Sequence, residues 1–335
     1  MHGIPGFEVD GAPAAERVPL DEADAMRIAA TTYGLDAASA ERLETERDDS
    51  FAIRASDESR YVLKVAHPAD SSDELDFQTG ALDFARNSDP GLPLQRILPG
   101  TNGSPLPVLP EHQGRIVRLF EWMPGDLLRN SRPDDDQLRA LGETLGRLTT
   151  ALDGFAHPAS WRPFAWDLAQ FATLEPLVQR FPSDELREVM ARFHANVAPR
   201  LDDLPHQVIH NDFNTGNVLV DPDAPGFVTG VIDFGDAIRT IRVADVAIAF
   251  SYQLVPLHRG WESAQPFLHG YETQVALIPA ERAVLRDLVI CRLAQRILIG
   301  EWLFDTEGAD AAAEASYGPY RAGMLDALRE LLEED

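Results

Sequence analysis

Lysine and cysteine are almost absent from this chain of 335 residues, which contains one of each. The single cysteine, Cys291, excludes an internal disulfide and a metal centre built from several cysteines. It lies in the apolar run 288–293, which predicts a buried and unreactive thiol. No apolar run reaches the ~20 residues of a membrane span, and residues 1–17 lack the pattern of a secretion signal. We therefore expect a cytoplasmic protein that inserts in no membrane.

Positive charge is also scarce. The chain has 55 acidic residues against 29 lysines and arginines, a formal net charge of −26. Such a charge disfavours binding to nucleic acid and to anionic membranes, whose phosphates it would repel. It would attract a cationic substrate. Solubility or adaptation to high salt explains the same composition equally well. The charge alone therefore does not decide among a cationic substrate, solubility and salt adaptation.

Three common nucleotide-binding and catalytic motifs are missing. There is no Gly-Lys pair for a P-loop, and no Gly-x-Gly-x-x-Gly for a dinucleotide fold. There is also no Gly-x-Ser-x-Gly turn that would expose a serine nucleophile. Any phosphate chemistry must therefore rest on a different arrangement.

Such an arrangement occurs in residues 207–236. His210, Asp212, Asn217 and Asp233 have the spacing that phosphoryl transfer from a nucleoside triphosphate requires. Asp212 is the candidate general base, and His210 is more plausible as an orienting group than as the base. Asn217 and Asp233 offer oxygen ligands that suit Mg²⁺. The strand patterns 218–220 and 227–234 flank a turn at 222–226 and would bring these groups together.

Two further aspartates accompany this set. Asp236 follows Asp233 closely and is as plausible on a metal or substrate as in a simple turn. Asp245 lies inside the apolar run 243–250, where it is expected to be a buried acceptor that braces the catalytic loop.

The only lysine, Lys64, lies on the strand pattern 61–65. An arginine fork is wider and more rigid than an ammonium on a flexible stem, so one tight phosphate site explains why this lysine persists. A kinase carries its phosphate-binding lysine on such an upstream strand. The turn 46–50 is the candidate cover for the phosphates. It contains no glycine, and Ser50 is its clearest side-chain donor.

The chain is expected to fold as an α+β protein with a small, mostly antiparallel lobe and a larger helical lobe. Residues 1–18 form a predicted tail, 19–123 the nucleotide-binding lobe, and 124–335 the catalytic and acceptor-binding lobe. Helices are predicted over 21–33, 71–86, 134–152, 164–181, 184–198, 243–253, 261–275, 280–304 and 320–332. Further strands are predicted over 40–45, 51–55, 94–98 and 115–122, with loops over 1–15 and 99–114.

These residues give the chain a resemblance to the aminoglycoside phosphotransferase and choline kinase-like family, and within it to hydroxylysine kinases. The matching segments are 209–219 and 231–235, with Lys64, Val117–Gly125 and the Asp76-Phe77-Gln78 helix. The resemblance implies a protein kinase-like fold, with backbone bonds from Glu121 and Met123 to the nucleobase. The family's helix glutamate, which pairs with the lysine, falls at Gln78. Glu74 or Asp76 is the expected substitute.

The resemblance implies a kinase that uses Mg²⁺ and ATP or GTP to phosphorylate an amino alcohol or hydroxy amino acid, first of all 5-hydroxylysine. Aminoglycoside or macrolide kinases, a homoserine-type kinase and a nucleotide-binding pseudokinase remain alternatives. The acceptor is expected to carry an ammonium held by carboxylates of the larger lobe. A homodimer, or a complex with an aminotransferase-type lyase, is the expected assembly.

Overall fold

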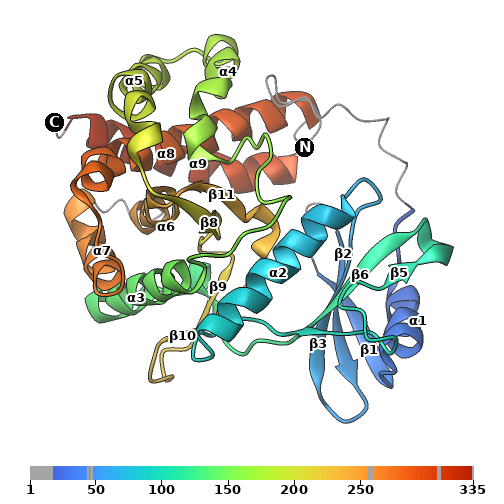
Figure 1. The fold of residues 1–335 in the computed structure, drawn as a ribbon. Coiled ribbons are helices and arrows are strands. Elements are labelled where there is room, and N and C mark those ends of the chain that lie inside the picture. The colour runs from blue at the N-terminus through green and yellow to red at the C-terminus, as the bar shows by residue number, and fades with distance from the viewer. Residues whose placement is uncertain (1–17, 44, 46–47, 256–259, 308–310, 334–335) are drawn as a thin grey trace.

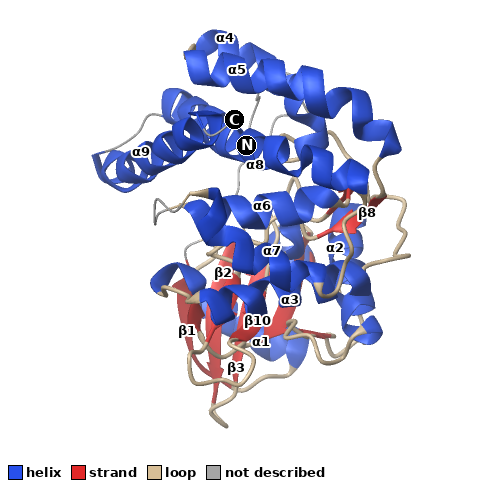
Figure 2. Ribbon diagram, turned by 90° about the vertical axis from the view of Figure 1, so that its left-hand side faces the viewer, coloured by secondary structure: helices blue, strands red, loops and turns tan. Residues whose placement is uncertain are grey.

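The computed structural model describes residues 18–43, 45, 48–255, 260–307 and 311–333 (Figure 1). An antiparallel sheet with two flanking helices forms the N-terminal part, and helices dominate the remainder (Figure 2). The expected α+β class is confirmed. The lobe boundary near Pro124 stays a prediction, and the expected tail lies almost wholly outside the described residues.

The N-terminal sheet has the order β1-β2-β3-β6-β4, with β5 also paired to β6. All of these pairings are antiparallel. The strands are β1 (Ala37–Leu43), β2 (Asp49–Ala55), β3 (Arg60–Val65), β4 (Ile97–Leu98), β5 (Val108–Leu109) and β6 (Arg115–Glu121).

Side-chain alternation along β3 decides where Lys64 points. Leu63 and Val65 pack in the core under α1 (Glu22–Tyr33). Val62 packs in the other core, which contains residues of α2 (Ser72–Ser88). Successive residues of a strand face opposite sides. Lys64 therefore shares the α2 side of the sheet with Val62, and this side faces the rest of the molecule.

Short strands and long helices make up the remainder. The strands form two small sheets, β10-β9-β7 and β11-β8. Their bounds are β7 (Asp126–Leu127), β8 (His206–Ile209), β9 (Val218–Val220), β10 (Val228–Val231) and β11 (Ile238–Ile241). The helices are α3 (Asp135–Ala151), α4 (Glu175–Arg180), α5 (Asp184–Arg192), α6 (Val243–Leu254), α7 (Gln265–Glu272), α8 (Pro279–Glu307) and α9 (Ala311–Glu333).

Glycines allow α3 and α7 to cross at very short range. A methyl group on Gly142 would lie 1.8 Å from the carbonyl oxygen of Phe267, and one on Gly270 would lie 2.0 Å from that of Arg139. Neither backbone could tolerate such an atom. This crossing buries the leucine stripe of α3, including Leu141 and Leu145, as its spacing predicts.

Several predicted elements needed correction. The helix expected over 164–181 is a 3₁₀ helix (Leu168–Leu174) followed by the short α4, and the one over 184–198 ends as a π-helix (Phe193–Val197). The strand expected over 227–234 is only β10, because Phe234–Asp236 forms a 3₁₀ turn. The loop expected over 99–114 contains β5. Of the strand over 94–98, only β4 forms.

Candidate active site

The predicted catalytic loop follows β8 and is held in place through hydrogen bonds of its backbone amides. The amides of His210 and Asn211 donate to the two carboxylate oxygens of Asp245 on α6, at 3.2 and 2.8 Å. Asn211 has a φ of 64°, in the left-handed region that asparagine tolerates better than most residues. Asp245 is fully buried, and burial raises its pKa to about 7. Its expected role as a buried acceptor bracing the loop is confirmed.

The His210 ring ties this loop to the β10 side of the site. Its Nδ1 accepts from the amide of Asp212 at 3.2 Å, so Nε2 carries the proton and donates to the carbonyl of Ile232 at 3.2 Å. Complete burial lowers the pKa of His210 to about 4, which keeps the ring neutral. These contacts place the ring as a brace between the loop and the strand.

Asp212 is held by two amide side chains. Asn214 donates to Oδ1 at 2.7 Å, and Asn217 donates to Oδ2 at 2.6 Å. Burial raises the pKa of Asp212 to about 6, although the nearby Arg292 and the two amides oppose this shift. A carboxyl group with this pKa is a stronger base than an exposed aspartate and is still largely ionised near neutral pH.

Asp233 opposes this loop and pairs with the lone lysine. Its Oδ2 accepts from Lys64 Nζ at 2.9 Å, and its Oδ1 accepts from the amide of Gly235 at 3.0 Å. The Lys64 ammonium holds the pKa of Asp233 well below its usual range. Asp233 has a φ of 66°, so a non-glycine residue occupies the left-handed region here.

The acidic partner expected for Lys64 on α2 was assigned wrongly. Glu74 lies 3.8 Å from Arg162 Nε, and Asp76 lies 3.3 Å from His157 Nε2. Each of these carboxylates has its own cationic or imidazole partner. Lys64 therefore pairs across to Asp233 instead of to the helix.

Gln78 contributes through hydrogen bonds to neighbours of Lys64. Its amide nitrogen donates to the carbonyl of Gly235 at 3.2 Å, and its oxygen accepts from Arg118 at 2.9 Å. Arg118 lies opposite Lys64 in the β3–β6 register and reaches Asp48 at 3.4 Å. The residue at the family's glutamate position thus holds an arginine that the sequence analysis did not select.

The remaining residues predicted to contact the nucleotide are Ser50 in β2, Glu121 at the end of β6, and Met123 just after it. Ser50 lies within β2, directly opposite Lys64, and its buried hydroxyl has no partner among the described residues. Glu46 and Arg47, also in the expected phosphate turn, lie outside the described residues. The amide of Glu121 donates to the carbonyl of Arg96 at 2.9 Å. The backbone amide of Met123 makes no hydrogen bond within the described part of the chain.

The predicted metal ligands lie beside the ends of two paired strands: Asn217 directly precedes β9, and Asp233 follows β10 by two residues. The amide of Ile232 donates to the carbonyl of Asn217 at 2.9 Å, which brings Asn217 next to Asp233. The Asn217 side-chain nitrogen is used on Asp212, so its side-chain oxygen remains for a ligand. Nowhere in the described chain are three or more His, Cys, Asp or Glu side chains arranged to hold a metal. The oxygen donors of Asn217 and Asp233 are of the kind that suits a hard ion such as Mg²⁺, which takes further ligands from phosphates and water.

Two arginines and an aspartate complete the site. Arg292 of α8 lies 3.6 Å from Asp212 Oδ1, and Arg162 donates to the carbonyls of Gly235 and Ala237. Burial and the charges of Asp212 and Asp233 raise the pKa of Asp236 to about 8. The sequence analysis missed both arginines. An available signal for Arg292 was a charge inside an otherwise apolar helical stretch.

Solved structures of small-molecule kinases share this fold. An amicoumacin kinase in complex with AMP-PNP, Ca²⁺ and its ligand superposes with a TM-score of 0.69 at 18% identity, covering 92% of this chain and 94% of that chain. A microcompartment-associated aminopropanol kinase gives 0.67 at 20% identity, covering 93% and 98%. These likenesses define the class: a kinase-like fold with an antiparallel sheet followed by a mostly helical region.

The family follows from sequence. The model of the phosphotransferase enzyme family matches residues 40–287, and the chain belongs to this family. A hydroxylysine kinase of Danio rerio is 27% identical over 301 residues, covering 84% of each chain. A homoserine kinase of Allorhizobium ampelinum is 30% identical over 259 residues, covering 74% of this chain and 76% of its own. The chain is therefore a phosphotransferase that acts on an alcohol group of a small molecule, as its sequence predicts.

The structure also bears on two expectations from the sequence, one about the single cysteine and one about membrane spans. Cys291 is fully buried, and burial raises the pKa of its thiol well above the usual value, which confirms the expected inert thiol. No helix in the described ranges has the length and apolar character needed to cross a membrane.

Proposed function

We propose that the chain phosphorylates the hydroxyl group of a hydroxy amino acid, with 5-hydroxylysine as the first candidate, using Mg²⁺ and ATP or GTP. The observation that carries the chemistry is Asp212, held between Asn214 and Asn217 and set opposite the Lys64–Asp233 pair. The relatives named as hydroxylysine kinases and homoserine kinases support the acceptor class.

In this proposal Asp212 orients the acceptor hydroxyl and takes its proton as the phosphoryl group is transferred. Asn214 and Asn217 keep the carboxylate in one rotamer, so its geometry is set before the acceptor arrives. His210 and Asp245 hold the loop backbone and do not exchange protons with the substrate.

The nucleotide would lie along the Lys64 side of the sheet. Lys64 would bind phosphate oxygens, with the Ser50 hydroxyl beside it, and the Met123 amide would donate to the base. Gln78 would act indirectly, by holding Arg118. Asn217 and Asp233 would hold Mg²⁺, which neutralises charge on the phosphates when bound. Lys64 would then exchange Asp233 for a phosphate as its partner.

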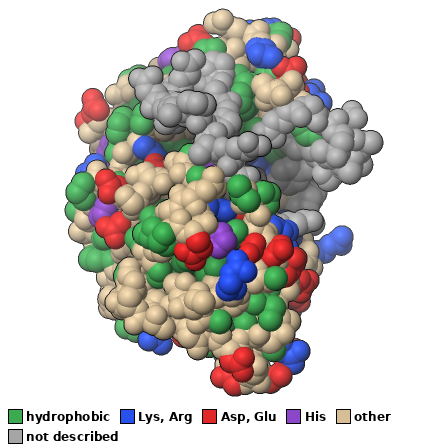
Figure 3. Space-filling view, turned by 90° about the vertical axis from the view of Figure 1, so that its right-hand side faces the viewer, with side chains coloured by type: hydrophobic (Ala, Val, Ile, Leu, Met, Phe, Trp, Pro, Cys, Tyr) green, Lys and Arg blue, Asp and Glu red, His purple; other side chains and the backbone are tan. Residues whose placement is uncertain are grey.

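Cation selectivity of the acceptor site is proposed to come from a partly buried carboxylate. The face in Figure 3 shows acidic and basic side chains interspersed among uncharged ones. The better candidate is Asp236, whose raised pKa reflects burial beside other carboxylates. A substrate ammonium at this point would favour its ionised form. Little salt dependence of the acceptor KM would follow.

A homoserine-type kinase is the second candidate, favoured by the 30% identity to the Allorhizobium enzyme. The antibiotic kinases remain a weaker alternative because the curated relatives are named for amino acid acceptors. A pseudokinase is weaker because Asp212, Asn217 and Asp233 are all present. Assembly as a homodimer or with an aminotransferase-type lyase also stays a prediction.

The test is a coupled screen of the full chain with Mg²⁺ that follows release of ADP from ATP or of GDP from GTP. The acceptors are 5-hydroxylysine, homoserine, an aminopropanol, an aminoglycoside and a macrolide. We expect the highest kcat/KM with a hydroxy amino acid. A higher value with an antibiotic or with the aminopropanol would refute the proposal, and ADP release independent of any acceptor would point to hydrolysis alone.

A further inference from the structure

Arg292 is a buried cation in the wall of the site, and it was not part of the predicted machinery. It lies on α8 and is 1% exposed. Its guanidinium stacks over the ring of Trp166, 4.8 Å from the ring centre. Its Nη1 donates to the carbonyl of Trp166 at 3.2 Å and to Gln295 Oε1 at 2.9 Å. These contacts fix the plane of the guanidinium.

The other edge of this guanidinium is buried but makes no hydrogen bond within the described residues. Nε has no hydrogen-bond partner among the described residues. Nη2 lies 3.6 Å from Asp212 Oδ1, too far for a hydrogen bond. Leaving buried donors unpaired costs free energy, and the cost is larger for a charged group than for a neutral one. An oriented and unfilled edge in this location therefore points to a ligand.

The chain shows elsewhere what this edge binds. Arg147 uses Nε and Nη2 to grip both oxygens of Asp89, each at 2.9 Å. Arg242 uses the same two atoms on the two oxygens of Glu281, at 3.0 and 2.7 Å. Two parallel bonds to one carboxylate are the preferred geometry of a guanidinium fork. At Arg292 the same edge has no hydrogen-bonded carboxylate, because Asp212 lies 3.6 Å from Nη2.

We propose that the Nε–Nη2 edge of Arg292 binds the carboxylate of the acceptor substrate. This inference rests on the proposed function and adds how the hydroxy amino acid binds: its carboxylate lies on Arg292 and its hydroxyl on Asp212. Because Nη2 lies 3.6 Å from Asp212 Oδ1, one small acceptor can reach both residues with its carboxylate and its hydroxyl. An amino alcohol without a carboxylate would leave the buried edge unpaired and be used poorly.

A phosphoryl group of the nucleotide is the other anion that could reach this edge. The two occupants predict different kinetics, because a carboxylate belongs to one substrate and the phosphoryl group to the other. Loss of a carboxylate contact affects only acceptors that have a carboxylate. Loss of a phosphoryl contact affects every acceptor equally and weakens the nucleotide as well.

The experiment compares Arg292→Gln with the unmodified chain on two acceptors, 5-hydroxylysine and its α-carboxamide. A charge-assisted pair contributes about 1.5–3 kcal/mol, or roughly 10–100-fold. We expect Arg292→Gln to lower kcat/KM for the acid by about that factor, mainly through KM, while the amide changes less than about threefold. The unmodified chain should prefer the acid over the amide by a similar factor, and the nucleotide KM should not change.

Two controls separate binding from folding. Arg147→Gln removes a carboxylate fork outside the site and should leave both acceptors unaffected. Arg292→Lys keeps the charge without the fork and should recover only part of the preference for the acid. Thermal melting of each variant reports whether the fold is retained, and the acid-to-amide ratio is independent of the fraction folded.

The outcomes distinguish the two claims. Equal losses on acid and amide, or a raised nucleotide KM, would overturn the assignment of Arg292 to the acceptor. An unmodified chain that uses acid and amide equally would overturn it as well, while leaving a hydroxylysine kinase intact. If no hydroxy acid is phosphorylated at all, the proposed function and this inference both fail.

Discussion

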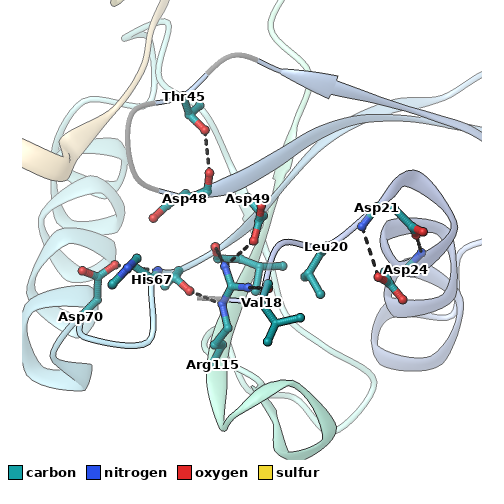
Figure 4. A network of polar contacts seen from close by, with 12 residues as sticks. Val18, Leu20, Asp21, Asp24, Thr45, Asp48, Asp49, His67, Asp70 and Arg115 are labelled. Carbon is teal, nitrogen blue, oxygen red and sulfur yellow. Dashed lines mark hydrogen bonds and ion pairs between the residues drawn. The ribbon is translucent and has the colours of Figure 1, made fainter. Parts of the chain in front are cut away.

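Two buried arginines of this chain, Arg115 in the N-terminal sheet and Arg292 in α8, have similar burial and opposite bonding. Arg115 is 2% exposed and donates from all three of its nitrogens: to the carbonyls of Ala66, Val65 and Val18, and to Asp49 Oδ2 at 2.7 Å (Figure 4). Arg292 is 1% exposed and donates from Nη1 alone.

This difference shows how a buried arginine that stabilises the fold can be told apart from one that can bind a ligand. Arg115 ties the N-terminal segment at Val18 to the ends of β2 and β3, and none of its nitrogens remains for a ligand. Asp49 also accepts from Arg42 at 3.1 Å, so the pair is part of a network. A buried charge with every donor used supports folding, whereas one with an unpaired edge beside the proposed base Asp212 is suited to binding.

The largest expected effect is on turnover, for a substitution of Asp212, the carboxylate next to Arg292. Asp212→Asn keeps the shape of the side chain and removes the proton acceptor, so kcat should fall by about 10²–10⁴-fold. Nucleotide affinity should persist, since this carboxylate faces the acceptor. Single-turnover assays with a nucleotide titration measure both. Turnover within about threefold of the unmodified chain would mean that Asp212 is not the base.

Substitution of Arg115 should instead lower the stability of the fold. Arg115→Gln leaves the buried Asp49 without its closest charge partner, which typically costs about 3–5 kcal/mol of unfolding free energy. Urea unfolding measures the loss. Activity per folded molecule should remain near normal, because Arg115 lies on the α1 side of the sheet, away from Lys64. A fall in kcat without a loss of stability would contradict the contrast between the two arginines.

A conservative substitution of Lys64 should have a smaller effect on catalysis than the loss of Asp212. Lys64→Arg keeps the charge, but the wider fork must fit between Asp233 and the strand opposite, where Arg118 already lies. We expect kcat/KM to fall at least about tenfold, equivalent to 1.4 kcal/mol. The reverse swap Arg54→Lys, at an exposed pair with Glu58, is the matched control and should be neutral. Equal behaviour of the two swaps would make the lone lysine a compositional accident.

The sequence predicted those parts of the site that local patterns encode. The spacing of His210, Asp212 and Asn217 follows from one loop between two strands, and the alternation in β3 directs Lys64 inward. Contacts between distant segments were not predictable in this way. The pairing of Lys64 with Asp233 joins residues 169 positions apart, and Arg292 reaches Asp212 from a helix whose packing has no local signal.

The same division explains the errors in the fold. The long helices α3 and α8 were both located well, and α3 also has a strongly periodic leucine stripe. The segment 164–181 looked helical, but Asp167 caps only a 3₁₀ helix, and its carboxylate also accepts from Thr240 of β11 at 2.7 Å. Short strands such as β7 and β11 are stabilised by partners far along the chain, so propensity alone did not reveal them.

The smallest expected effect comes from Arg147, which has the complete carboxylate fork that Arg292 lacks. Arg147 grips both oxygens of Asp89 at the end of α2, but both side chains are about 30% exposed, at 31% and 30%. Water therefore competes for both partners, and such pairs contribute at most about 1 kcal/mol. Arg147→Ala should lower the unfolding free energy by no more than this in urea titrations, with a smaller difference at high salt. A loss above about 2 kcal/mol would show that bonding geometry outweighs burial, and would weaken the use of burial to separate Arg115 and Arg292 from surface arginines.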